Sequence, residues 1–172
     1  MQAHSRTLVI EALSAEAFAP FGDVIAARDG VKTFAINQGY ATRFHDLARV
    51  DVADQGGGVC VSIFQAVPRV LPMQLSVMER HPLGSQAFMP LSPLPYLVVV
   101  AEAAPGPDLA RLRCFRAAPG QGVNYARGTW HHPLLALQAE SEFLVVDRGG
   151  AASDANCDEY PLTDTPCWVG EP

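Results

Sequence analysis

A short segment near the middle of the chain brings together three polar side chains of the kind that bind metals or transfer protons. Glu79 and His81 are two residues apart, so on an extended strand they share one face and Arg80 takes the other. Pro82 ends such a strand because it has no N–H to donate, and a turn lets Gln86 return toward the same face. A carboxylate, an imidazole and an amide in one group could hold a metal or an anionic substrate. The same pattern also fits a surface hairpin in which Glu79 and Arg80 form a solvated pair.

A second segment, residues 124–133, contains two adjacent histidines. Neighbouring side chains of a strand point to opposite faces, so at most one of His131 and His132 belongs to a given pocket. A neutral imidazole can ligate a metal, and its pKa suits proton transfer near neutral pH. The pair also fits one hydrogen-bonded histidine in the core and one histidine on the surface.

Arg43 and His45 share one face of another predicted strand. A guanidinium group matches a carboxylate with two hydrogen bonds, so Arg43 is a candidate clamp for an acidic substrate. An ion pair between Arg43 and Asp46 near the surface explains the same residues without a substrate.

Short strands, separated by glycine and proline throughout the chain, must position these residues. Ten segments have the apolar pattern of strands: 7–12, 33–36, 41–46, 59–66, 73–79, 86–89, 96–101, 112–117, 131–137 and 142–147. The last of them ends in the charge pair Asp147–Arg148, which we interpret as architectural. Helical signals are confined to residues 14–18, where a serine can cap a helix, and to a single turn at 107–110. This pattern predicts an all-β fold, a closed barrel or sandwich, in one domain covering residues 1–172.

The amino-acid composition argues against two classes of protein, those that bind nucleic acid and those that cross a membrane. Of the 172 residues, 49 % are hydrophobic and 17 % are charged, and the net charge is −6. An acidic surface repels phosphates, so we expect no nucleic acid as a partner. We also expect no membrane segment, because the longest strongly apolar run, 97–101, is far shorter than the roughly 20 residues that cross a bilayer. The four cysteines are scattered without a CxxC pair, which favours free thiols in a reducing cytoplasm.

The two polar segments resemble the two motifs of the cupin superfamily. Glu79 and His81 followed by Gln86 are similar to the first motif, and residues 126–131 are similar to the second, PxGxxH, with alanine in place of its proline. A narrower resemblance, to the ureidoglycolate lyase family, covers most of the chain in the family's order. It rests on five blocks: INQGYATRFHDLA (36–48), ERHPLGSQAFMP (79–90), GVNYARGTWHHPL (122–134), FLVVDRGG (143–150) and NCDEY (156–160).

The resemblance implies a cupin-like double-stranded β-helix (jelly-roll) barrel with a few short helices, in a cytoplasmic homodimer. It implies a carbon–nitrogen lyase of the amidine-lyase type that splits (S)-ureidoglycolate into glyoxylate and urea in allantoin breakdown. It also implies a divalent metal, nickel being the ion associated with the family, at Glu79, His81, Gln86 and His131. Glutamate stands here in place of the first cupin histidine, and glutamine in place of the cupin glutamate. An amide oxygen is a weak ligand for a transition metal.

Ureidoglycolate is a hemiaminal, and its cleavage needs a base for the hydroxyl proton, an acid for the departing nitrogen and a group that holds the carboxylate. With the resemblance in place, we expect acid–base and metal chemistry from Glu79, His81 and His131. Four residues are expected to bind substrate: Arg43 or Arg127 through its carboxylate, and Gln86 and Tyr125 through its urea group.

Three alternatives stay open. A ureidoglycolate amidohydrolase would release ammonia from the same substrate, whereas a non-catalytic cupin would bind a small acid without converting it. A metal-dependent dioxygenase is disfavoured, because the ligand set is weak for iron.

Overall fold

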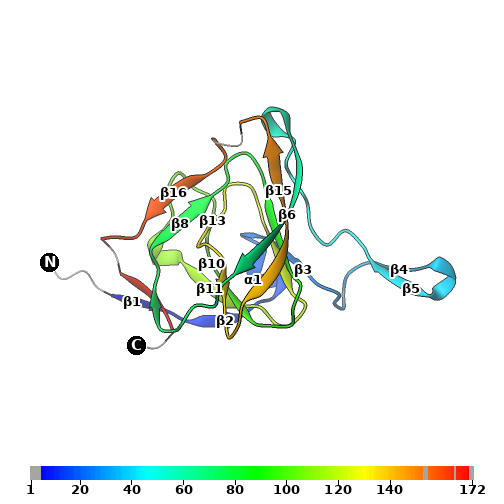
Figure 1. Cartoon of the computed structure of the whole chain (residues 1–172), viewed down its shortest axis with the longest axis horizontal. Coiled ribbons are helices and arrows are strands. Elements are labelled where there is room, and N and C mark those ends of the chain that lie inside the picture. The colour runs from blue at the N-terminus through cyan, green and yellow to red at the C-terminus, as the bar shows by residue number, and fades with distance from the viewer. Residues whose placement is uncertain (1–4, 153–154, 165, 171–172) are drawn as a thin grey trace.

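The computed structural model describes residues 5–152, 155–164 and 166–170. Strands dominate this part of the chain (Figure 1), so the all-β prediction is confirmed. The α-helix α1 (Ala15–Phe18) follows Ser14, whose hydroxyl caps it by accepting the N–H of Ala17 as expected. No helix in the described ranges combines the length and the apolar character that a membrane crossing requires.

The strands of the described residues form four sheets. Sheet A contains β1 (Arg6–Leu8), β17 (Cys167–Val169) and β7 (Met73–Gln74). Sheet B contains β16 (Asp158–Pro161), β8 (Val77–Arg80), β13 (Trp130–His131), β10 (Tyr96–Ala101), β11 (Arg113–Arg116) and β2 (Ile10–Ala12), with β14 (Leu135–Ala136) also paired to β10. Sheet C contains β3 (Gly22–Ile25), β12 (Gly122–Tyr125), β9 (Gln86–Pro90), β15 (Ser141–Gly150) and β6 (Gly57–Ala66). Sheet D contains β4 (Thr33–Ile36) and β5 (Ala41–Phe44), and the 3₁₀ helices are η1 (Asn37–Gly39), η2 (Asp54–Gly56) and η3 (Leu109–Arg111).

Between β8 and β15 the chain passes repeatedly from one large sheet to the other. β8 belongs to sheet B, β9 to sheet C, and β10 and β11 to sheet B; β12 then returns to sheet C, β13 to sheet B and β15 to sheet C. This alternation winds two facing sheets around a common interior, as in a jelly roll. The chain is therefore a cupin-like barrel, and aromatic side chains such as Phe88, Phe115 and Phe143 fill its interior.

Strand β10 shows how the sequence places the core. Val98 and Val100 point into the interior between sheets B and C, whereas Leu97 and Val99 pack in a second cluster toward sheet A. Both faces of the strand are covered, which explains why its sequence is continuously apolar rather than alternating. Burial of each such side chain contributes roughly 1.5–3 kcal/mol, so the strand is a rigid support for β13 beside it.

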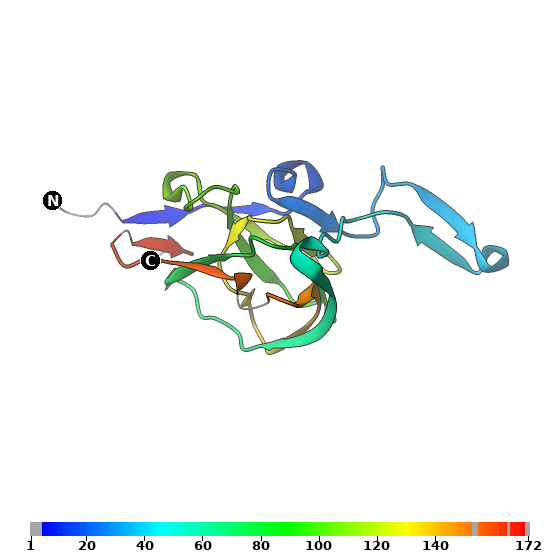
Figure 2. The ribbon, with the colours of Figure 1, turned by 90° about the horizontal axis from the view of Figure 1, so that it is seen from above.

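The hairpin of β4 and β5 stands away from the barrel (Figures 1 and 2). Its two strands pair only with each other among the described strands, and all four residues of β4 are exposed. Residues 26–50, which contain this hairpin, are called the arm below.

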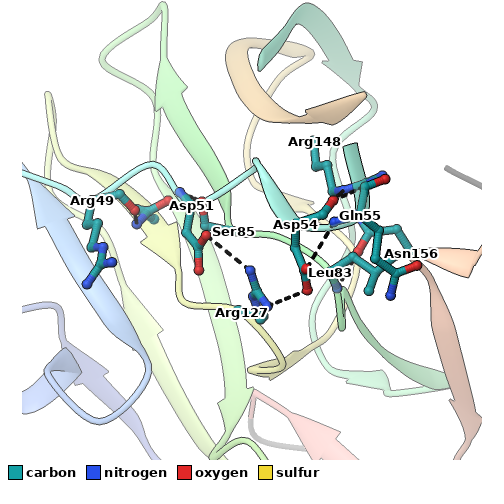
Figure 3. Close-up of polar contacts among 10 residues, drawn as sticks. Arg49, Asp51, Asp54, Gln55, Leu83, Ser85, Arg127, Arg148 and Asn156 are labelled. Atoms are coloured by element: carbon teal, nitrogen blue, oxygen red, sulfur yellow. Dashed lines mark hydrogen bonds and ion pairs between the residues drawn. The ribbon is translucent and has the colours of Figure 1, made fainter. Parts of the chain in front are cut away.

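A polar network fastens the base of the arm to the barrel, and part of it is drawn in Figure 3. The backbone N–H of Arg49 donates to the Asp23 carboxylate, and the side-chain amide of Asn124 donates both to Asp23 and to the carbonyl oxygen of Arg49. Next along the chain, the N–H of Asp51 donates to the hydroxyl of Ser85, whose own N–H donates to the carbonyl oxygen of Asp51, both at 2.8 Å. These bonds fix the direction in which the arm leaves the barrel.

Candidate active site

Three residues with proton-transfer or metal-binding side chains converge on the inner face of sheet B. Glu79 on β8 and His131 on β13 lie directly opposite each other in paired strands, which places their side chains on the same side of the sheet. His81 follows one residue after the end of β8 and returns to the face of Glu79. Ligand atoms of the three residues lie within 4.8 Å of one another. The structure thus brings together the three residues expected to carry the acid–base chemistry, and they are called the cluster below.

His131 is held firmly and is only 2 % exposed. Its Nδ1 donates to the carbonyl oxygen of Thr129 at 3.1 Å, and its ring stacks on Tyr125 with 4.1 Å between centroids and 12° between planes. Burial lowers the pKa of His131 below its ordinary value, and the contact with Glu79 offsets this only in part. The ring is therefore neutral near pH 7. The other ring nitrogen, Nε2, lies 3.3 Å from Oε1 of Glu79.

Glu79 is placed to act as a base. Burial alone raises the pKa of its carboxyl group, but the contact with His131 and the positive charge that neighbouring histidines can carry outweigh burial. The pKa of Glu79 therefore lies below its ordinary value. The carboxylate is ionised near neutral pH although it is largely buried.

Both ring nitrogens of His81 have hydrogen-bond partners, one of which is itself held by Asp147. Nε2 of Gln86 donates to the Asp147 carboxylate at 3.2 Å, and a carboxylate can only accept. This turns Oε1 of Gln86 toward Nε2 of His81, at 3.1 Å. The other ring nitrogen, Nδ1, faces the carbonyl oxygen of Asn156 at 2.7 Å. Both ring nitrogens of His81 face oxygen acceptors, so the arrangement is fully satisfied when both nitrogens carry a hydrogen.

A cavity of about 400 Å³ opens beside the cluster, with Glu79 in its wall. Phe64 and Phe88, whose rings meet edge to face with centroids 5.7 Å apart, give the cavity an apolar side. Arg69 gives it a positive charge. The volume is in the range of small-molecule sites. Sequence reasoning does not find Arg69, because it lies in the irregular connection between β6 and β7, where no periodic pattern marks it.

The other residues expected to bind substrate have different surroundings. Tyr125 is fully buried, and burial raises its pKa well above the ordinary value. Arg127 forms ion pairs with Asp51 at 3.1 Å and Asp54 at 2.8 Å, beside the base of the arm (Figure 3). Arg43 is exposed on β5 of the arm. Neither arginine lines the cavity beside the cluster.

The cluster also contains donors that suit a divalent transition metal, namely one carboxylate and two imidazoles. Nε2 of His131 is buried without a hydrogen-bond partner among the described residues, and it lies 3.3 Å from Oε1 of Glu79. A cation between these two atoms would satisfy both. His81 would join such a site only after its Nε2 releases a hydrogen and separates from Gln86. The donor set of Glu79, His81 and His131 therefore fits a divalent ion, whereas the oxygen of Gln86, expected as a fourth ligand, contacts Nε2 of His81.

Comparison with known proteins identifies the family to which the chain belongs. A model of the ureidoglycolate lyase family matches residues 5–169, which include the whole cluster. The chain is 53 % identical over 163 residues to the ureidoglycolate lyase of Burkholderia mallei (strain NCTC 10229), covering 92 % of this chain and 95 % of that protein. It is 55 % identical over 157 residues to the ureidoglycolate lyase of Burkholderia cepacia, with 90 % and 86 % covered. Among solved structures it is similar to a dTDP sugar isomerase of Desulfovibrio desulfuricans G20, with a TM-score of 0.46, 14 % identity, and 84 % and 87 % covered.

Proposed function

The chain belongs to the ureidoglycolate lyase family, and we propose that the cluster and the cavity beside it are the site at which it splits ureidoglycolate into glyoxylate and urea. The position of the Glu79 carboxylate carries this proposal, because it belongs both to the cluster and to the cavity wall. A substrate in this cavity meets a base, Glu79, and a guanidinium group, Arg69, and the hydrogen-carrying imidazole of His81 lies next to the base within the cluster. Those are the three functions that cleavage of a hemiaminal requires.

Glu79 is the proposed base. Its ionised carboxylate accepts the proton of the substrate hydroxyl group, and the oxygen that loses this proton forms the carbonyl bond of glyoxylate. The electrons of the C–N bond leave with the urea nitrogen. Water enters none of these bonds, so the step is an elimination and not a hydrolysis.

His81 is the proposed acid. Its Nε2 carries a hydrogen because Gln86, held by Asp147, presents an oxygen to it, and this hydrogen passes to the departing urea nitrogen. The proton that Glu79 took from the hydroxyl group then restores His81 within the same cluster, which balances the protons over one turnover. General acid–base catalysis of this kind contributes about 10²–10⁴-fold.

Arg69 is the proposed partner of the substrate carboxylate, since it is the guanidinium group that lines the cavity. Neither Arg43 nor Arg127 lines this cavity, and their role as carboxylate clamps stays a prediction. Tyr125 acts through its stacked ring, which fixes the plane of His131. Gln86 acts through His81, which its side-chain oxygen contacts, and its direct contact with urea stays a prediction.

We further propose that Glu79 and His131 hold a divalent metal, that His81 joins them only when its Nε2 has released its hydrogen, and that nickel is the ion, as the resemblance implies. When bound, such an ion lowers the pKa of a coordinated substrate hydroxyl group.

The four free cysteines support a cytoplasmic protein, because thiols stay reduced there. The family resemblance also supports a homodimer.

The test is a product assay on racemic ureidoglycolate with chelator-treated and nickel-supplemented protein, corrected for spontaneous breakdown. Enzyme-dependent urea and glyoxylate without ammonia are expected. Ammonia as the main nitrogen product would indicate the amidohydrolase, and saturable binding without any product would indicate a non-catalytic small-acid cupin. Higher turnover in the nickel-supplemented protein is expected, and equal turnover in both preparations would contradict the metal proposal.

A further inference from the structure

The NCDEY block, residues 156–160, is fastened beside the cluster. Its first residue, Asn156, is buried and makes two contacts with the end of β8 and the turn that follows it. The carbonyl oxygen of Asn156 faces Nδ1 of His81 at 2.7 Å, and its side-chain oxygen accepts the N–H of Leu83 at 2.8 Å. The next residues enter β16, which pairs with β8, and β8 pairs in turn with β13 (Figure 1). The block therefore has a fixed position next to Glu79.

Alternation along β16 distributes the acidic side chains of this block between two faces. Glu159 lies directly opposite Glu79 in the paired strands, so both carboxylates are on the same face of sheet B. Asp158 points to the other face, where its carboxylate forms an ion pair with Arg80 at 2.8 Å. Cys157, two residues before Glu159, shares the face of the two glutamates. Register and alternation thus bring one thiol and two carboxylates together.

The thiol and the two carboxylates are close enough to hold one ion. Sγ of Cys157 and a carboxylate oxygen from each of Glu79 and Glu159 lie within 4.8 Å of one another. No arginine or lysine in the described ranges forms an ion pair with Glu159. Burial raises the pKa of the Cys157 thiol, and the neighbouring carboxylates raise it further, so the electrostatic potential at the sulfur is negative. A cation would neutralise this concentration of acidic groups.

A separate observation concerns Glu79, which belongs both to this group and to the cluster. Nε2 of His131, a side chain only 2 % exposed, has no hydrogen-bond partner within the part of the chain that the structure describes. It lies 3.3 Å from Oε1 of Glu79. A buried polar atom without a partner is rare in folded proteins unless an ion, a ligand or water satisfies it. The Glu79 carboxylate therefore has candidate metal ligands on both sides.

We propose that Cys157, Glu159 and Glu79 form a second cation site, called the sulfur site below, which binds a divalent ion of the zinc type. Zinc is bound in proteins through cysteine sulfur and through glutamate oxygen, and thiolate ligands select it over hard ions such as magnesium. As the bond between Sγ and the ion forms, the thiol proton leaves to solvent. The required sulfur distinguishes this site from the cluster, whose ligands are one carboxylate and two imidazoles.

The sulfur site shares its central carboxylate with the proposed reaction. An ion in this site holds the Glu79 carboxylate, which then cannot accept the proton of the substrate hydroxyl group. We therefore expect zinc to inhibit urea release. This consequence rests on the proposed function, whereas the binding of the ion does not.

The ultraviolet absorption of cadmium–thiolate bonds tests the sulfur site directly. Cadmium chloride, a probe for zinc sites, is titrated into the full chain after reduction and removal of metals. The wild type is expected to develop the charge-transfer band of one thiolate per chain, and Cys157→Ser is expected to lose it. Glu159→Gln should weaken cadmium binding at least about tenfold, because even the loss of an outer-shell partner has an effect of this size. An ion held by the cluster alone has no sulfur ligand and gives no such band.

Two matched controls change the same residue types elsewhere. Cys60→Ser removes the other thiol that is not buried, and Glu142→Gln neutralises an exposed carboxylate on β15. Both should keep the band and the cadmium affinity of the wild type. A wild type without the band would overturn the sulfur site, and so would a folded Cys157→Ser protein that keeps it. Unchanged cadmium affinity in Glu159→Gln would contradict the ligand set.

Urea release from the same samples, with and without zinc chloride, separates the sulfur site from the proposed function. Cys157→Ser should need at least about tenfold more zinc than the wild type for the same inhibition. Equal inhibition of both proteins would contradict the inhibitory role of this site. A band that depends on Cys157 in a protein that releases no urea leaves the sulfur site and removes the lyase site. Urea release from a protein without the band has the opposite meaning.

Discussion

Asp147 orients the side-chain amide of Gln86, whose Nε2 donates to the Asp147 carboxylate at 3.2 Å. Because the donor end of the amide is held in this way, its oxygen faces His81 at 3.1 Å. Glutamine is therefore more than a weak substitute for the cupin glutamate. It connects the cluster to a carboxylate on β15 that determines where His81 carries hydrogen.

Substitution of Asp147 tests this connection. In Asp147→Asn the new side chain can itself donate, so the amide of Gln86 loses its fixed orientation. Hydrogen bonds to charged groups contribute about 1.5–3 kcal/mol against about 0.5–1.5 kcal/mol for neutral ones. We therefore expect kcat for urea release to fall about tenfold, the equivalent of about 1.4 kcal/mol, with KM little changed. Steady-state kinetics measure both constants.

The control for Asp147→Asn is Glu142→Gln, the same type of change at an exposed carboxylate on the same strand. Its kinetics should stay within about twofold of the wild type, as expected for a surface site. If Asp147→Asn behaved like this control, the orienting role of Asp147 would be wrong.

Replacement by alanine should change KM at Arg69 and the free energy of unfolding at Arg127. Arg69→Ala removes the guanidinium group of the cavity wall, so KM should rise more than about tenfold while stability stays unchanged. Arg127→Ala breaks two partly exposed ion pairs, each worth about 0–1 kcal/mol, so the free energy of unfolding should fall by about 1 kcal/mol with KM unchanged. Kinetics and denaturant unfolding measure the two effects. A raised KM in Arg127→Ala alone would assign the substrate carboxylate to Arg127.

Mild acid should destabilise the fold through its adjacent histidines. Burial lowers the pKa of both His131 and His132 in the folded chain. In the unfolded chain each returns to an ordinary pKa of about 6.5, so below that pH the unfolded state binds more protons and the free energy of unfolding falls as pH falls. The stability is complete above about pH 6.5, and the loss approaches about 1.4 kcal/mol per pH unit for each histidine.

Thermal melts in buffers from about pH 7.5 to about pH 5.5 follow this loss of stability. His132→Gln removes one of the two protonation sites and should make the fall in melting temperature shallower. A wild-type melting temperature that stays constant over the same range would show that neither histidine resists protonation in the folded chain.

Local rules predict much of the cluster. Alternation along a strand places Glu79 and His81 on one face, and the structure adds the pairing of β8 with β13 that brings His131 to them. That pairing joins segments far apart in the sequence, and only the resemblance of the two segments to cupin motifs indicated it. Arg69 has no such signal, because it lies in a connection without regular structure.

The sequence pattern also predicts some strands of the fold and misses others. The apolar pattern does not predict β3 or β12, because glycine, aspartate and asparagine interrupt both strands and are disfavoured in sheets. Their polar residues Asp23 and Asn124 hold the base of the arm instead of contributing to the core. The pattern does predict strands at 33–36 and 41–46, but alternation cannot show that this hairpin stands apart from every larger sheet.

The assignment of Glu79 as the base is tested most directly by urea release from Glu79→Gln, which removes the proton acceptor and keeps the size of the side chain. We predict that kcat falls at least about 100-fold, while the melting temperature stays close to that of the wild type. The matched control is Glu142→Gln, the same change at an exposed carboxylate on β15, which should retain full activity. A folded Glu79→Gln protein that releases urea within a few-fold of the wild-type rate would contradict the proposed site.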